Sequence, residues 1–220
     1  MPWTALSTGW RAALEQMFRA WTEGCLPIGA AIADPEGRVV AAGRNAIGGG
    51  DGSMPVHGHC LAHAELNAIL QLDEEEYPAI RTYTLYTTLE PCPLCFGAAV
   101  MGHIRHIVYA GRDPVGGAAG LNDSIPYVRN KNLRVEGPVE TLEAVSYAFK
   151  TVWALERPDL GGRMLTHYID ACPSGVRVGE KLFVTGALKR IVQDGGGMAE
   201  AYEWILRLLE GDRTALAFGS

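Results

Sequence analysis

Two short segments constrain the fold more than any other feature, because each carries side chains that bind metal ions. "LAHAELNAIL", residues 61–70, contains His63 and Glu65, and "TLEPCPLC", residues 88–95, contains Cys92 and Cys95. Cysteines at positions i and i+3 direct both sulfurs to one side of a helix start, where Pro93 is tolerated and the helix dipole favours thiolates. If His63 joins the two cysteines, residues 29 positions apart must meet around one metal.

The ligand count points to chemistry rather than to structure alone. Three protein ligands with an open fourth position are typical of catalytic zinc, and water in that position would have its pKa lowered towards about 7. Residues at i and i+2 do not share a helix face, so Glu65 is a poor fourth ligand but a good general base and acid beside that water. The cysteine pair alone leaves structural zinc and a thioredoxin-like redox site open.

Composition and charge limit the class of protein. The chain has 220 residues, 48% apolar and 20% charged, which is a globular balance. It has no apolar run of about 18 residues, and its first segment lacks a basic stretch followed by an apolar one, so a cytoplasmic protein without membrane contact is expected. Five scattered cysteines fit reduced thiols. The net charge of −6 comes without a basic stripe, which disfavours a nucleic-acid partner.

Hydrophobic patterning predicts alternating helices and strands, and therefore an α/β layer arrangement. The expected helices span 6–21, 61–72, 95–102 and 139–156. The expected strands are a hairpin around "DPEG" that ends at Asn45, strands over 82–89 and 105–111, and an edge strand over 132–137. A glycine-rich loop is expected over 46–60. "RPDLGG", residues 157–162, reads as a break, followed by helices over 179–194 and 198–211. The chain is thus divided into a domain over 1–156 and a helical extension over 157–220.

The pairing of "HAE" at 63–65 with "PCPLC" at 91–95 resembles the zinc-dependent cytidine deaminase superfamily, whose H-x-E and P-C-x-x-C signature it matches. "PIGAAIAD", "GRN", "TLEPCPLCFGAAV" and "IRHIVYAGRDPVGGAAG" are similar to the branch with tRNA adenosine deaminases and bacterial guanine deaminases. The resemblance covers about residues 8–155. It implies a three-layer α-β-α sandwich around a central mixed sheet of about five strands, usually assembled as a homodimer.

The resemblance also implies roles for individual residues. His63, Cys92 and Cys95 would be the zinc ligands, and Glu65 the proton shuttle. Zinc-bound hydroxide would attack the carbon that carries the amino group, Glu65 would protonate the ring nitrogen and then the leaving amine, and ammonia would depart. The implied substrate contacts are Asn45, the backbone N–H of Ala64, Glu90, Pro91, Asp113 and Asp123.

Some segments depart from this branch. "HGHCLAHAE" stands where relatives often read D-P-T before A-H-A-E. His59 lies four residues before His63, on the same helical face if the helix extends that far, and Cys60 is its neighbour, so a second or alternative metal ligand stays open, although a loop histidine without a metal is more common. The helix over 139–156 lacks the basic character of tRNA deaminases, which favours a small purine-like substrate of the guanine or guanosine type. The alternatives are tRNA adenosine (A-to-I) deamination and a non-catalytic zinc-stabilised binding module. An alternative role for Asp113 is an ion pair with Arg112 that holds the loop. Cys172 is expected only to pack.

Overall fold

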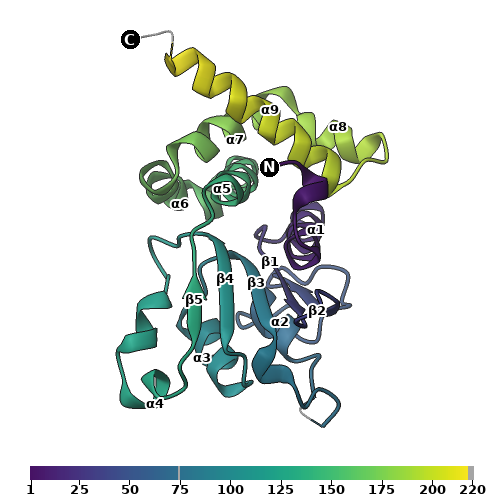
Figure 1. Cartoon of the computed structure of the whole chain (residues 1–220). Coiled ribbons are helices and arrows are strands. Elements are labelled where there is room, and N and C mark those ends of the chain that lie inside the picture. The colour runs from purple at the N-terminus through teal and green to yellow at the C-terminus, as the bar shows by residue number, and fades with distance from the viewer. Residues whose placement is uncertain (74, 218–220) are drawn as a thin grey trace.

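The computed structural model describes residues 1–73 and 75–217 and has a mixed five-stranded sheet at its centre (Figure 1). The strands lie in the order β2-β1-β3-β4-β5, in which β1 is antiparallel to β2 and β3 while β3, β4 and β5 run parallel. Their bounds are β1 Gly29–Ala33, β2 Val39–Arg44, β3 Thr84–Leu89, β4 His106–Gly111 and β5 Arg134–Glu136. The predicted hairpin around "DPEG" is confirmed as β1 and β2.

Helices cover both faces of the sheet, which confirms the predicted three-layer α/β sandwich. Strand side chains alternate between the faces. Ile32 and Leu85 pack with α2 and α3, whereas Tyr86 contacts Trp10 of α1. The helices of these layers are α1 Thr8–Thr22 and α5 Glu140–Glu156 on one face, and α2 Ala64–Ile69 and α3 Pro93–Met101 on the other; the short α4 spans Pro126–Arg129. Ser7 caps α1 by accepting a hydrogen bond from the Trp10 N–H.

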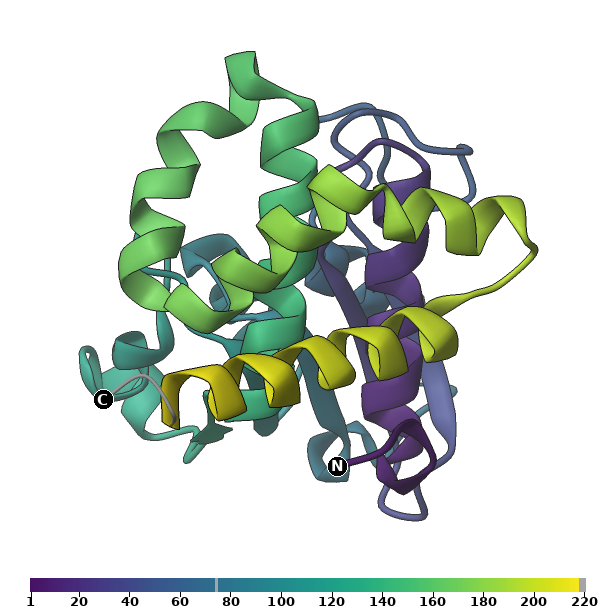
Figure 2. The same ribbon diagram turned by 90° about the horizontal axis from the view of Figure 1, so that it is seen from above.

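The C-terminal segment adds one helix beside α5 and further helices in a layer above α1 and α5 (Figures 1 and 2). Its elements are α6 Pro158–Ala171, α7 Pro173–Thr185, α8 Ala187–Gln193 and α9 Met198–Ala217. One apolar cluster joins α1, α5 and these helices, so the extension buries its apolar faces on the rest of this chain. Gly175 and Gly179 let α7 lie directly against the backbone of α5. The division of the chain into a domain over 1–156 and an extension over 157–220 stays a prediction.

Three local expectations are corrected by the structure. Residues 158–162 are helical rather than a break, because Pro158 occupies the first turn of α6, where its missing N–H costs nothing. The helix expected over 179–194 is divided by Gly186, whose positive φ of 63° ends α7. The helix expected over 61–72 is only Ala64–Ile69. Within the described part of the chain, no helix combines the length and apolar character needed to cross a bilayer.

Candidate metal centre and substrate cavity

Two helix N-termini bring the predicted ligands together. His63 is the N-cap residue of α2, Cys92 is the N-cap residue of α3, and Cys95 lies in the first turn of α3 behind Pro93. The Nδ1 atom of His63 lies 3.4 Å from the Sγ atoms of both cysteines. The three candidate ligand atoms all lie within 4.8 Å of one another.

These distances fit a tetrahedral zinc ion. Zn–S bonds of about 2.3 Å and Zn–N bonds of about 2.1 Å place a nitrogen and a sulfur roughly 3.6 Å apart. The 3.4 Å separations observed here differ from that spacing by about the tolerance expected for a metal site. Two thiols and an imidazole are also the donor set that zinc prefers. The residues present therefore fit the metal that their motif predicts.

The ligand pKa values reflect the close packing of the three groups. Hydrogen bonding from Cys95 lowers the pKa of the Cys92 thiol to about 4, with a further contribution from His63. The same bond to Cys92, together with burial, raises the pKa of Cys95, and a hydrogen bond to Cys92 raises the pKa of His63. Because zinc binds cysteine as the thiolate and histidine as the neutral imidazole, bound zinc would displace protons from these groups.

Glu65 lies in the first turn of α2 and is only 4% exposed. Its Oε1 atom lies 3.2 Å from the hydroxyl of Thr87 on β3. Burial raises the pKa of this carboxyl group. Glu65 is not a member of the ligand cluster, as expected for a residue two positions from His63. The side chains of Glu65 and His63 nevertheless line the same cavity.

The position of His59 does not support an alternative metal ligand. Because α2 begins only at Ala64, His59 lies in the preceding turn and shares no helix face with His63. Its Nδ1 accepts a hydrogen bond from the Leu61 N–H at 3.1 Å. Within residues 1–73 and 75–217, the one metal-binding group found contains neither His59 nor Cys60.

A cavity of about 390 Å³ opens beside the cluster, within the size range of small-molecule sites. Four of the predicted substrate contacts, Asn45, Ala64, Glu90 and Asp113, are among its lining residues. Asn45 is buried and its amide oxygen accepts a hydrogen bond from the Ile47 N–H. The other two predicted contacts lie elsewhere: Pro91 accepts a backbone bond from Ala118, and Asp123 is on an exposed 3-10 turn. Neither of these two is among the described lining residues.

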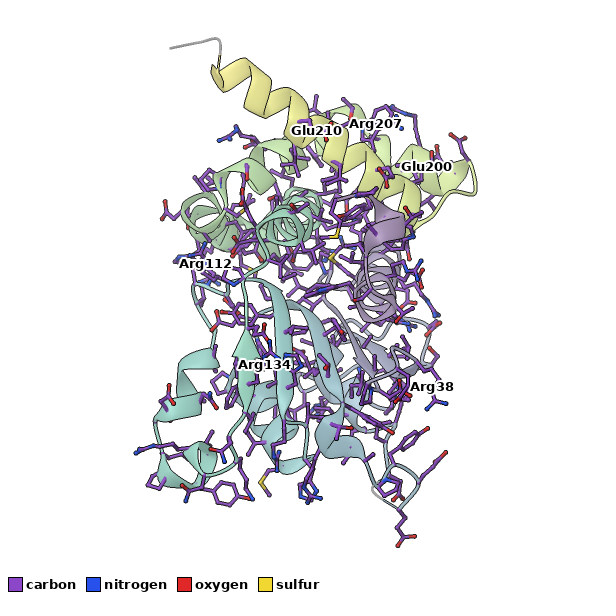
Figure 3. All side chains as sticks on the ribbon, in the orientation of Figure 1. Arg38, Arg112, Arg134, Glu200, Arg207 and Glu210 are labelled. Atoms are coloured by element: carbon purple, nitrogen blue, oxygen red, sulfur yellow. The ribbon has the colours of Figure 1, made fainter. Side chains whose placement is uncertain are left out.

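Glu90 and Asp113 organise the loop after β4. The two carboxylate oxygens of Glu90 accept hydrogen bonds from the N–H groups of Ala119 and Asp113. Asp113 in turn accepts from the N–H groups of Val115 and Gly116 through its Oδ1 atom. The alternative pairing of Arg112 with Asp113 is wrong, because Arg112 pairs with Glu143 of α5, with Nε and Oε1 3.3 Å apart. Arg112 lies between the sheet and the helical layer in Figure 3.

Comparison with known proteins identifies the family. The model for the cytidine and deoxycytidylate deaminase zinc-binding region matches residues 4–111. Guanine deaminase from Bacillus subtilis is 31% identical over 118 residues, covering 50% of this chain and 70% of that protein. The chain belongs to the cytidine and deoxycytidylate deaminase family. Its cofactor is zinc, and His63, Cys92 and Cys95 are positioned to bind a metal ion.

Other relatives carry names that refer to different substrates and, in one case, to a different activity. The tRNA-specific adenosine deaminase of Bacillus subtilis is 32% identical over 115 residues, covering 50% of this chain and 64% of the relative. A tRNA(Ile)-lysidine synthase from Deinococcus radiodurans is 40% identical over 95 residues, or 43% of this chain, but the chain spans only 15% of that protein. A solved tRNA:A34 deaminase superposes with a TM-score of 0.53 at 27% identity, covering 66% of this chain and 99% of that one. The names of these relatives differ in substrate, so they do not identify a substrate for this chain.

Part of the cavity is lined by residues that the sequence prediction did not include. Helices α5 and α6 contribute further lining residues, all beyond the region matched by the family model. These are Tyr147, Lys150, Arg163, Met164, His167 and Tyr168. A signal is present in the sequence, because Lys150 interrupts the apolar run "AVSYAFKTVWAL", where a lysine without an evident acidic neighbour is unusual.

Proposed function

We propose that this deaminase removes an amino group from a free nucleobase, a nucleoside or a related small heterocycle, with purine-type compounds such as guanine or guanosine favoured. One observation carries the proposal: the buried carboxyl group of Glu65 lines the same cavity of about 390 Å³ as His63 and Cys92 of the ligand cluster. A structural zinc site has no use for a buried carboxylate beside its ligands. A cavity of this volume accommodates a compact heterocycle.

The residues of the chain divide the reaction between them. His63, Cys92 and Cys95 would hold zinc, which when bound supplies a Lewis acid that lowers the pKa of water. Asn45 and the backbone N–H of Ala64 would orient the heterocycle so that its amino-bearing carbon meets the attacking water. Glu65 would take a proton from that water and deliver it to the ring nitrogen. It would then transfer the second proton to the departing amine, so that a carbonyl compound and ammonia are formed.

A comparison of Glu65→Gln with wild type tests this proposal. The zinc-loaded proteins are assayed for ammonia release from a panel of aminopurines, aminopyrimidines and their nucleosides, and zinc per chain is measured in parallel. The expected result is one zinc in both proteins and a loss of turnover of roughly 100- to 10,000-fold in the variant. Glu15→Gln, at an exposed position on α1, is the matched control and should retain full turnover. A Glu65→Gln protein with turnover within a factor of three of wild type would contradict the assigned role.

Deamination of adenosine in tRNA is the second candidate, since the adenosine deaminase of Bacillus subtilis is as similar to this chain as the guanine deaminase is. Inosine formation in a tRNA transcript, with no ammonia from the small-molecule panel, would favour this alternative. A protein that binds its ligand equally well with and without Glu65, and turns over nothing, would instead be a zinc-stabilised binding module. Homodimer formation and a cytoplasmic location stay predictions, the first of which sedimentation analysis would test.

A further inference from the structure

The part of the cavity that α5 and α6 enclose contains a buried amine. Glu143, Tyr147 and Lys150 follow one another at i, i+4 and i+7, so they share the face of α5 that is directed towards the loop after β4 and towards α6. Helix α6 runs beside α5 (Figures 1 and 2) and contributes Tyr168, whose ring meets that of Tyr147 edge to face at 5.4 Å. Lys150 is 1% exposed and lines the cavity.

The ammonium group of Lys150 lacks an acceptor. Within the described part of the chain, its Nζ atom has no hydrogen-bond partner. It lies 3.5 Å from the ring centroid of Tyr147 and 5.3 Å from that of Tyr168, and these ring faces attract a cation without accepting a conventional hydrogen bond. A buried polar group left in this condition is costly. An aliphatic side chain would fill the same space without this cost, so we infer that the amine has a functional role.

The nearby carboxylates already have donors of their own. Glu143 accepts from the backbone N–H of Arg112 at 3.0 Å and pairs with its guanidinium group. Asp113 accepts two backbone bonds, and Glu90 accepts two more. Two further nitrogen-bearing side chains on α6, Arg163 and His167, line the same cavity one helical turn apart. Lys150, Arg163 and His167 thus supply donors to one cavity, and they match a ligand that brings acceptors and negative charge.

We propose that Lys150, together with Arg163 and His167, forms a subsite for a carboxylate or phosphate substituent carried by the heterocycle that is deaminated. The inference rests on the proposed function, because it places the reacting amino group at Glu65 and the anionic substituent against α5 and α6. It narrows the substrate class from amino-heterocycles in general to those that bear an anionic group. The selectivity then comes from residues beyond the part of the chain matched by the family model.

The protonation of Lys150 supports this assignment. Burial lowers the pKa of its amine to about 7, and Asp113, Cys172 and Glu143 offset part of that effect. An anion placed against the amine would restore the protonated form. The titratable and charged groups around Lys150 are Glu143 and Tyr147 on its own helix, Asp113 on the loop after β4, and Arg163, His167, Tyr168 and Cys172 on α6 and at its end.

Matched pairs of probes test the subsite by calorimetric titration of the zinc-loaded full chain. Guanosine is compared with guanosine 5′-monophosphate for the phosphate arm, and cytosine with 5-carboxycytosine for the carboxylate arm. A charge-assisted contact predicts that wild type binds the anionic member of at least one pair roughly 10- to 100-fold more tightly. In Lys150→Met this ratio should fall to within about threefold. The arm that shows the preference identifies the substituent.

The same titrations distinguish the proposed subsite from two alternatives. In the first, zinc itself binds the anion, and in the second, Lys150 only packs against its neighbours. Lys131→Met removes an ammonium that lies 4.6 Å from the ring centroid of Tyr127, outside the lining of this cavity, and should keep the wild-type ratio. An anion that simply ligates zinc would be preferred equally by Lys150→Met, and that result overturns the proposal. If Lys150 served only to pack against tyrosine rings, its replacement would lower the melting temperature and leave the binding ratio unchanged, which also overturns it.

The outcomes for the subsite and for the proposed function are distinguishable. A Lys150-dependent preference without ammonia release from any probe would support the subsite and contradict the deaminase assignment for these compounds. Ammonia release from neutral probes, with no preference for anionic ones in either arm, would support the deaminase assignment and overturn the subsite.

Discussion

At Gly43 on β2 the backbone of helix α2, which begins beside His63, lies directly against the sheet, and Gly43→Ala perturbs that contact. An added Cβ would overlap the carbonyl oxygen of Ala64 and lie 2.5 Å from the backbone nitrogen of Ala68. Ordinary contact begins near 3.4 Å, so strand and helix must separate by about 0.9 Å. Both obstacles are backbone atoms, which cannot rotate away as a side chain end can.

The magnitude follows from this overlap. Overpacking of a filled core costs about 1–3 kcal/mol, and the upper part of that range applies where backbone must move. Because His63 caps α2, the same shift carries its imidazole away from Cys92 and Cys95. Metal–ligand distances tolerate only about 0.2 Å of error. Zinc affinity should therefore fall by roughly 10- to 100-fold, as it does when other supports of a metal site are removed.

Urea unfolding with and without a chelator, together with competition for zinc against a chromophoric chelator, measures both effects. The matched control is Gly97→Ala on α3, where an added Cβ meets nothing within 4 Å. That variant should be stabilised by about 0.5–1 kcal/mol, because alanine is the better helix former. If Gly43→Ala unfolds within about 0.5 kcal/mol of wild type and binds zinc as tightly, the close approach of α2 does not position the metal centre.

Three further predictions test other parts of the structure. Arg44 is fully buried and pairs with Glu23 at 2.7 Å and Asp51 at 2.5 Å, so Arg44→Met should lower the free energy of unfolding by about 2–4 kcal/mol in urea titrations, whereas an unchanged value would show that the pairs contribute nothing. The Cβ added in Gly161→Ala would overlap Ala154 of α5, so the variant should displace α6 and weaken binding of the anionic probe severalfold. Unaltered binding would show that α6 does not contribute to the subsite. The unfolded chain holds the Lys150 proton up to about pH 10.5, whereas the folded pKa is about 7. Wild-type stability should therefore rise with pH between these values relative to Lys150→Met, by at most about 1.4 kcal/mol per pH unit, and parallel stability curves would refute the buried amine.

The metal centre is predictable from the sequence because its information is local. The i and i+3 spacing of Cys92 and Cys95 and the Pro93 between them specify a helix start, and the structure begins α3 there. The "DPEG" turn likewise specifies the hairpin of β1 and β2. His63 can be assigned to the same site only by combining both segments, since nothing in its own helix indicates which residues it meets.

The extension is predicted less well because its signals depend on tertiary contacts. Pro158 and Gly161 read as a break in isolation, yet Pro158 opens α6 and Gly161 gives the close approach to Ala154 on α5. In the sequence, Lys150 is one charge on a largely acidic helix, and nothing there reveals that α6 covers it. Burial of that amine is a property of two helices together.

Structure and selectivity are coupled through these contacts. Gly161 sets α6 against α5, and the ring contact between Tyr168 and Tyr147 then encloses Lys150. If α6 were absent, water would solvate the amine, its pKa would return towards its ordinary value, and an anion would gain little from displacing that water. The same enclosure that makes Lys150 costly when the cavity is empty makes its ion pair with a bound anion stronger. Selectivity for an anionic substrate is thus expected to depend on the docking of α6. Zinc binding is not expected to depend on it, because the ligands lie at the starts of α2 and α3.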